Sequence, residues 1–119
     1  MIVYFDSSAL IKNFIEEPGS QELEKFMRDT AHLAVNLFTT ATITHAEVAA
    51  TIARAKRNNR LLDEEFKQVI EDFKEQWELF YSVVVDEAIA QLSGELGLKH
   101  KLKGCDAVQL ACALESETD

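Results

Sequence analysis

Apolar residues in this chain follow two spacings, one typical of strands and the other typical of helices. Three short runs rich in β-branched and aromatic residues predict buried strands over residues 2–5, about 35–43 and 80–85. Elsewhere apolar residues recur every three or four positions, which predicts amphipathic helices. The expected helices cover residues 7–16, 20–29, 44–57, 63–77, 86–96 and about 105–116, with Gly97 loosening the end of the fifth.

The order of these elements is one strand followed by two helices, repeated three times. Alternation of this kind favours an α/β fold in which helices cover both faces of a parallel sheet. We therefore expect a three-layer fold, in a single domain that covers residues 1–119. In such sheets, ligands bind beyond the carboxyl ends of the strands, so candidate chemistry is sought there.

Three acidic residues from distant parts of the chain are placed near that edge. Asp6 follows the first strand, Glu47 lies one turn into the helix after the second, and Asp106 begins the last helix. Ser8 and Thr44 add neutral hydroxyl groups beside them. Oxygen ligands of this kind suit Mg²⁺ or Mn²⁺, so these acids form a candidate metal site.

Each acid also has a purely structural interpretation. Asp6 and Asp106 stand at helix starts, where a carboxylate caps the helix or is favoured by its dipole. Thr44 and Glu47 match the capping-box pattern, in which the glutamate bonds back to the start of its own helix. The residues alone leave both interpretations open.

Charge adds two further candidate surfaces. The formal net charge of −9 is unusual for a nucleic-acid-binding protein, but two basic runs stand apart from the acidic segment 63–78. Each run is either a solvated surface or a contact for a nucleic-acid backbone. The candidate contacts are Arg54, Lys56, Arg57, Arg60, Lys101 and Lys103.

Aromatic residues are concentrated in the helix over residues 63–77. Phe66, Phe73 and Trp77 supply more aromatic bulk than a small core requires, so we expect part of the helix pair over about residues 47–77 to lie in a dimer or partner contact. Cys105 and Cys112 stand too far apart on one helix to form a disulfide, and we expect two buried thiols. The start of the chain does not resemble a signal peptide, and no run approaches the ~18–20 apolar residues of a membrane span. A cytoplasmic protein without a membrane contact is expected.

Three motifs, in this order, resemble those of the PIN-domain family. Residues 5–12 (Phe-Asp-Ser-Ser-Ala-Leu-Ile-Lys) are similar to its opening, an aspartate after strand one followed by small polar residues. Residues 44–48 (Thr-His-Ala-Glu-Val) resemble the second motif, and residues 102–111 (Leu-Lys-Gly-Cys-Asp-Ala-Val-Gln-Leu-Ala) resemble the third. The likeness extends from residue 2 to about residue 116 and is closest to the VapC-like toxins.

This resemblance implies a divalent-metal-dependent endoribonuclease that is the toxin of a toxin–antitoxin module. By the same likeness Asp6, Glu47 and Asp106 are metal-binding catalytic acids, with Ser8 and Thr44 in support. RNA is the implied substrate, and an antitoxin protein and a second copy of the chain are the implied partners. PIN domains usually continue into another strand, often with a fourth acid, so that strand is expected to be missing from a sequence that stops at Asp119.

Two other functions remain open at this stage. One is a catalytically impaired PIN-like module that binds RNA or an antitoxin. The other is a phosphatase of the haloacid dehalogenase type, which also places an aspartate after strand one. That chemistry needs a second acid two residues later, where this chain has Ser8.

Overall fold

A parallel sheet of three strands lies at the centre of the molecule. The computed structural model describes residues 2–30 and 37–117. Strands β1 (Ile2–Tyr4), β2 (Leu37–Ala41) and β3 (Tyr81–Val83) are hydrogen-bonded in the order β1-β2-β3. Both pairings are parallel, with Val3 opposite Phe38 and Thr40 opposite Ser82. The parallel sheet expected from the sequence is therefore confirmed.

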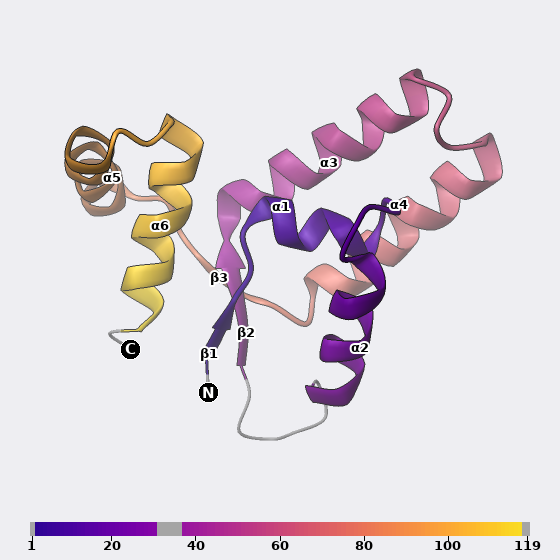
Figure 1. Cartoon of the computed structure of the whole chain (residues 1–119), viewed down its shortest axis with the longest axis horizontal. Helices are drawn as coiled ribbons and strands as arrows, with labels where there is room; N and C mark the ends of the chain where they lie inside the picture. Colours follow the sequence, from indigo (N-terminus) through magenta and orange to yellow (C-terminus); the bar gives the residue numbers. More distant parts are fainter. Residues whose placement is uncertain (1, 31–36, 118–119) are drawn as a thin grey trace.

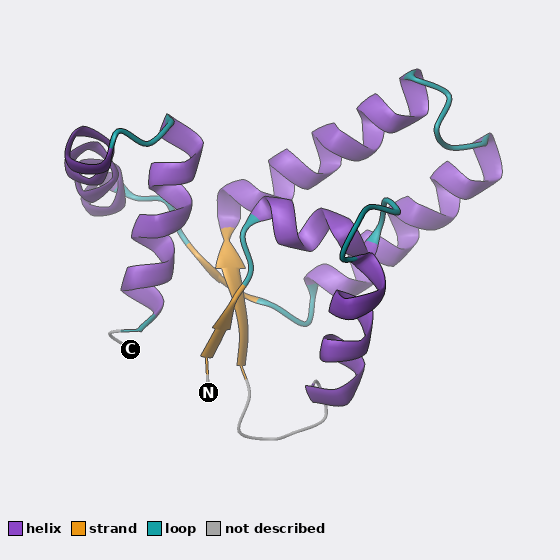
Figure 2. Cartoon of the chain, in the orientation of Figure 1, coloured by secondary structure: helices purple, strands orange, loops and turns teal. Residues whose placement is uncertain are grey.

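Helices cover both faces of this sheet and make three layers (Figures 1 and 2). Helices α5 and α6 lie on one side, whereas α1 to α4 lie on the other, where α3 and α4 form a projecting hairpin. This is the α/β architecture that the element order predicts. The helices are α1 (Ser7–Leu10), α2 (Ser20–Thr30), α3 (Thr42–Arg57), α4 (Asp63–Trp77), α5 (Glu87–His100) and α6 (Gly104–Ser116), and η1 (Ile11–Asn13) is a 3-10 helix.

Separate apolar clusters bury the two faces of the sheet. On the α5–α6 side the buried residues are Ala41, Val83, Ile89, Ala111 and Cys112. The opposite face is covered by the cluster of Phe5, Met27 and Phe38. A further cluster on that side joins α1, η1, α3 and α4. Because each face carries its own cluster, helices are needed on both sides of the sheet.

Phe73 belongs to the core and not to a partner surface. Its side chain is 3% exposed, and its ring contacts those of Phe14, His45 and Trp77 at centroid distances of 5.4, 4.9 and 6.0 Å. Phe66 and Trp77 pack against the same cluster and remain half-buried. Phe73 therefore does not contribute to the expected partner surface, and a partner contact through part of this surface stays a prediction for Phe66 and Trp77.

Several predicted boundaries differ from the structure. Residues 35–36 of the expected second strand lie outside the described residues, and Thr42 already begins α3. The predicted helix over residues 7–16 divides into α1 and η1, whereas α5 continues through Gly97 to His100. Cys112 is buried as expected, but Cys105 is exposed, because it lies on the outer side of the first turn of α6.

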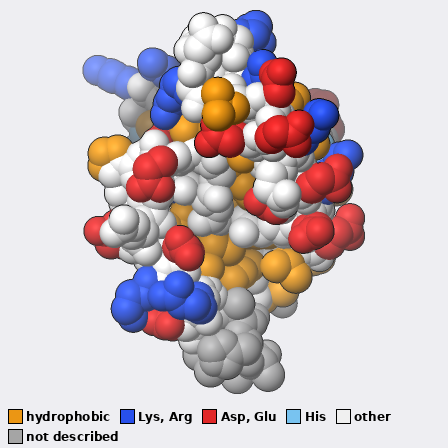
Figure 3. Space-filling view, turned by 90° about the vertical axis from the view of Figure 1, so that its right-hand side faces the viewer, with side chains coloured by type: hydrophobic (Ala, Val, Ile, Leu, Met, Phe, Trp, Pro, Cys, Tyr) orange, Lys and Arg blue, Asp and Glu red, His pale blue; other side chains and the backbone are white. Residues whose placement is uncertain are grey.

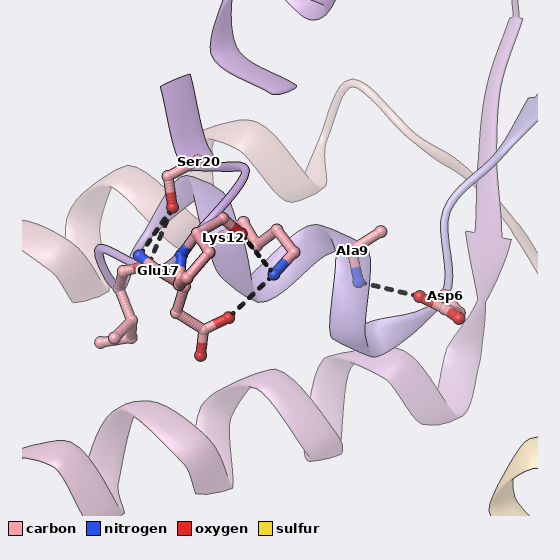
Figure 4. A network of polar contacts seen from close by, with 7 residues as sticks. Asp6, Ala9, Lys12, Glu17 and Ser20 are labelled. Carbon is pink, nitrogen blue, oxygen red and sulfur yellow. Dashed lines mark hydrogen bonds and ion pairs between the residues drawn. The ribbon is translucent and has the colours of Figure 1, made fainter. Parts of the chain in front are cut away.

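A short turn after η1 is held by side-chain bonds (Figure 4). The Lys12 ammonium donates to the Glu17 carboxylate at 3.2 Å and to the Pro18 carbonyl at 3.0 Å. The hydroxyl of Ser20 accepts from the Glu17 backbone N–H at 2.9 Å. Gly19 has a φ of 96°, which L side chains rarely adopt, so the turn requires a glycine there. This turn directs the chain from the sheet edge into α2.

Thr39 and Thr40, neighbours in β2, offer a matched test of buried hydroxyl groups. Thr39 is 1% exposed, and its hydroxyl has no hydrogen-bond partner among the described residues. The hydroxyl of Thr40 is equally buried but donates to the Phe5 carbonyl at 2.6 Å. We expect Thr39→Val to raise the free energy of unfolding by about 1 kcal/mol, because valine keeps the shape and removes an unpaired polar group.

Thr40→Val serves as the opposite control. It should lower the free energy of unfolding by roughly 1–3 kcal/mol, because a buried carbonyl loses its donor. Urea unfolding of both variants measures the difference. Equal effects of the same sign would contradict the expectation.

Candidate functional site

Asp6 stands where β1 ends and α1 begins. Its backbone is extended, and its Oδ1 accepts a hydrogen bond from the Ala9 backbone N–H at 2.8 Å (Figure 4). Asp6 therefore caps α1, as the structural interpretation predicts. A carboxylate has a second oxygen, however, and Asp6 Oδ2 has no hydrogen-bond partner among the described residues. Because the side chain is exposed, this oxygen remains available to a ligand.

The capping-box interpretation of Glu47 is wrong. Helix α3 begins at Thr42, so Thr44 lies inside the helix, fully buried, and its hydroxyl lies 2.9 Å from that of Thr40. The Glu47 Oε1 accepts from the Gln109 side-chain amide at 2.9 Å and not from its own helix start. Glu47 is thus oriented by a contact with a distant helix.

Gln109 joins three parts of the fold and was not singled out from the sequence. Its amide accepts from the Tyr4 hydroxyl at 2.6 Å and donates to Thr44 and Glu47, both at 2.9 Å. We call Tyr4, Thr40, Thr44, Glu47, Gln109 and the Phe5 carbonyl the Gln109 network. It links β1, β2, α3 and α6 at the carboxyl end of the sheet.

Asp106 lies in the first turn of α6 and is exposed. Gln109 follows it by three residues, and residues three apart are neighbours on a helix surface. The bonds of Gln109 to Glu47 and Tyr4 therefore hold the turn that carries Asp106 close to the end of β1. The spacing of three residues between Asp106 and Gln109, which puts both on one helix face, is the sequence signal that could have suggested a role for Gln109 beside the acids.

Electrostatic effects connect two of the acids through Tyr4. Burial raises the pKa of the Tyr4 hydroxyl well above its ordinary value, and the charges of Cys112, Asp6 and Glu47 raise it further. Because such interactions weaken with distance, Asp6 and Glu47 both lie within electrostatic range of this hydroxyl. Tyr4 consequently remains a hydrogen-bond donor throughout the physiological pH range.

The acids do not form a closed ligand set. Over residues 2–30 and 37–117, no three His, Cys, Asp or Glu side chains lie close enough together to hold a metal ion. Their chemistry nevertheless fits a hard divalent cation, since carboxylate oxygens are the ligands that Mg²⁺ and Mn²⁺ prefer. Without a cation, like charges repel, so separated side chains are the expected metal-free arrangement.

A small cavity opens beside Glu47. It has a volume of about 330 Å³ and lies between α1 and α3. Three hydroxyl residues, one carboxylate and one guanidinium line it, supplied by Ser7, Ser8, Thr51, Glu47 and Arg54. Of the residues expected from the sequence, the structure therefore brings Ser8, Glu47 and Arg54 together.

The remaining basic residues are distributed more widely. Lys56 is paired with Asp63 at 2.7 Å, and its ammonium group lowers the pKa of that carboxyl. Arg57 ends α3, and Arg60 lies in the connection to α4. Lys101 and Lys103 are exposed between α5 and α6, on the approach to Asp106. Arg54, Lys101 and Lys103 are consequently the basic candidates nearest to the predicted acids.

A larger cavity of about 780 Å³ lies elsewhere, between α2 and α4. Figure 3 shows this side of the molecule, where acidic side chains surround a hollow with apolar side chains at its floor. Arg60 is the only candidate nucleic-acid contact among its lining residues, and Asp6, Glu47 and Asp106 are not among them. This cavity is therefore separate from the candidate site.

None of the helices in the described ranges combines the length and apolar character needed to cross a membrane.

Comparison with known proteins gives a consistent family. The PIN domain model matches residues 3–119. Two curated relatives are Ribonuclease VapC45 of Mycobacterium tuberculosis strain CDC 1551 / Oshkosh and Ribonuclease VapC49 of M. tuberculosis strain ATCC 25618 / H37Rv. Each is 34% identical over 113 residues, a match that covers 95% of this chain and 75% of the relative. This leaves no support for the haloacid dehalogenase alternative, and the chain belongs to the PIN domain family.

Proposed function

We propose that this protein is a divalent-metal-dependent endoribonuclease and the toxin of a toxin–antitoxin module that acts in the cytoplasm. The observation that carries the proposal is the meeting of Glu47, Ser8 and Arg54 in one cavity between α1 and α3, the helices that directly follow β1 and β2. The names of the two relatives, both ribonucleases, support the same reaction class. An antitoxin partner and a homodimer remain predictions.

In this proposal Asp6, Glu47 and Asp106 hold Mg²⁺ or Mn²⁺. When bound, the ion supplies charge stabilisation at the scissile phosphate and a nucleophilic water near neutral pH. Arg54 carries a positive charge, opposite to that of Glu47, and its guanidinium can donate hydrogen bonds to a phosphate oxygen. Ser8 can donate a hydrogen bond to the same phosphate, whereas Thr44 is buried and acts only through the Gln109 network.

The basic side chains near the acids are also expected to bind the RNA backbone. The net charge of −9 repels RNA, so binding depends on local positive charge. Arg54, Lys101 and Lys103 flank the candidate acids and are the best placed to contact the RNA backbone. Arg57, at the end of α3, and Arg60, in the connection to α4, extend this path. Lys56 is the weakest candidate, because Asp63 already binds its ammonium group.

A second candidate function is an impaired PIN-like module that binds RNA or an antitoxin without cutting. It is favoured by the absence of a closed three-acid group in the described part of the chain. The two functions differ in what a metal ion does. A pure binding module has no reason to bind Mn²⁺ through these acids.

Thermal unfolding with and without Mn²⁺ tests the proposal. A metal that binds only the folded state adds RT ln(1 + [L]/Kd), about 2.7 kcal/mol at a hundredfold excess over Kd. We expect Mn²⁺ to raise the melting temperature, RNA cleavage to need Mn²⁺ or Mg²⁺, and a chelator to stop it. An unchanged melting temperature together with metal-independent binding of RNA would favour the binding module.

A further inference from the structure

Gln109 uses nearly all of its hydrogen-bonding capacity inside the protein. The side chain is 6% exposed, and its amide makes three hydrogen bonds to Tyr4, Thr44 and Glu47. A primary amide has two N–H donors and one carbonyl oxygen. Both donors and the oxygen are therefore engaged. The orientation of the amide decides whether its nitrogen or its oxygen faces the Glu47 carboxylate.

The neighbouring hydroxyl groups fix that orientation. The Phe5 carbonyl can only accept, and the Thr40 hydroxyl donates its one hydrogen to it at 2.6 Å. The hydrogen between Thr40 and Thr44, whose oxygens lie 2.9 Å apart, must then come from Thr44. Thr44 has no hydrogen left for Gln109, so it accepts from the amide nitrogen.

The same order determines the other end of the network. Because the amide nitrogen faces Thr44, it also faces Glu47, and the amide oxygen faces Tyr4. The Tyr4 hydroxyl donates its hydrogen to that oxygen at 2.6 Å. The donor and the acceptor of every hydrogen bond in the network are thus fixed, and the Glu47 carboxylate accepts from the Gln109 amide.

We infer that Gln109 is a positioning residue that holds the Glu47 carboxylate, through Oε1, in the orientation needed to bind a divalent cation with its other oxygen. This inference rests on the proposed function. Glu47 Oε2 has no hydrogen-bond partner among the described residues, and the side chain lines the cavity that Ser8 and Arg54 share. Carboxylates that bind metals are commonly held by such outer hydrogen bonds.

The position of Gln109 on α6 extends its effect to a second acid. Asp106 lies three residues before it, so the amide that orients Glu47 also fastens the turn that carries Asp106. Gln109 therefore sets the relative placement of two acids that come from different helices.

Gln109→Met tests this inference, because methionine keeps the length of the side chain and removes the amide. Mn²⁺ binding to the folded protein, measured by calorimetry at a temperature where circular dichroism shows the variant folded, should weaken roughly ten- to a hundredfold. The matched control is Gln91→Met on α5. Gln91 also donates to a carboxylate, that of Glu87 at 3.2 Å, but on the exposed surface, so Mn²⁺ affinity should not change.

A second readout separates positioning from simple support of the fold. The electron paramagnetic resonance spectrum of Mn²⁺ at saturation reports ligand geometry, and it should differ between Gln109→Met and wild type. A residue that only stabilised the fold would lower the melting temperature and leave both the affinity and the spectrum of the folded protein unchanged. That result would overturn the inference.

Tyr4→Phe keeps the test decisive if Gln109→Met does not fold. It removes only the hydroxyl that anchors the amide oxygen, and a weaker loss of Mn²⁺ affinity, of a few-fold, is expected. If wild type does not bind Mn²⁺ at all, the proposed function itself fails. A different result would refute only the role of Gln109. In that result wild type binds Mn²⁺ and Asp6→Asn does not, whereas the folded Tyr4→Phe and Gln109→Met variants bind Mn²⁺ as tightly as wild type.

Discussion

Replacing Asp6 with asparagine is expected to abolish the Mn²⁺-dependent rise in melting temperature and to reduce RNA cleavage by more than about a hundredfold. Asparagine keeps the oxygen that accepts from the Ala9 N–H and caps a helix about as well as aspartate. It removes the negative charge that a cation requires. Without metal the variant should melt at the wild-type temperature or slightly above it, because repulsion among the acids decreases.

Asp86→Asn is the matched control for this substitution. Asp86 caps α5 as Asp6 caps α1, with its side chain accepting from the Ile89 N–H at 3.0 Å. It has no proposed catalytic role, so its variant should retain both the metal response and cleavage. Asp106→Asn should behave like Asp6→Asn. An Asp6→Asn or Asp106→Asn protein that keeps its metal response and its cleavage would show that the site is wrongly assigned.

Truncating Phe73 to alanine should lower the free energy of unfolding by about 3–5 kcal/mol. The ring is buried among the residues that join α1, η1, α3 and α4, so its removal leaves a cavity in a closely packed core. Small domains are stable by roughly 5–15 kcal/mol in total, so this one substitution removes a large part of that stability. Urea unfolding followed by circular dichroism measures the loss.

Leu79→Ala provides the comparison for a large apolar residue at the surface. Leu79 is 65% exposed, and its truncation should change the free energy of unfolding by no more than about 0.5 kcal/mol. A small loss for Phe73→Ala, accompanied by a change in oligomeric state, would instead indicate that Phe73 serves a partner contact.

The sequence predicted the fold well because the fold depends on patterns that are local. Val48 and Ile52, four residues apart in the expected helix over residues 44–57, are fully buried. The helices expected to start at residues 63 and 86 start at Asp63 and, with Asp86 as the cap, at Glu87. Strand ends were less accurate. The β-branched residues Thr42 and Ile43 favour a strand by propensity, yet they begin α3, because tertiary packing outweighs so weak a preference.

The buried face of the last helix was predicted less well than its position. Apolar residues at helical spacing in this helix predict that Leu110 and Leu114 are buried with Ala107 and Ala111, yet the two leucines are 37% and 41% exposed, whereas Gln109 is buried. Hydrophobicity alone ranks leucine as the more buried residue. The polar partners of Gln109 lie up to 105 positions away, at Tyr4, so no local pattern could reveal them.

For the candidate site, the sequence suggested three acids but not the contact that orients Glu47. Thr44 and Glu47 fit a capping box by spacing, which the start of α3 at Thr42 and the contact of Glu47 with Gln109 exclude. The metal ligands themselves remain a prediction, because no three candidate ligands are grouped in the described residues.

The position of α6 has a consequence for synthesis of the protein. This helix supplies Ala111 and Cys112 to the cluster over Ala41 and Val83, so the sheet lacks this cover until α6 has been made. At about 5–20 residues per second, a ribosome needs roughly 1.5–6 seconds to advance from Val83 to Cys112. During that interval the growing chain exposes an apolar sheet face that a chaperone could bind. The Glu47 carboxylate likewise lacks its Gln109 partner, and the candidate site lacks Asp106, until α6 emerges, so under this proposal the metal site of a nascent chain stays incomplete until its last helix has been made.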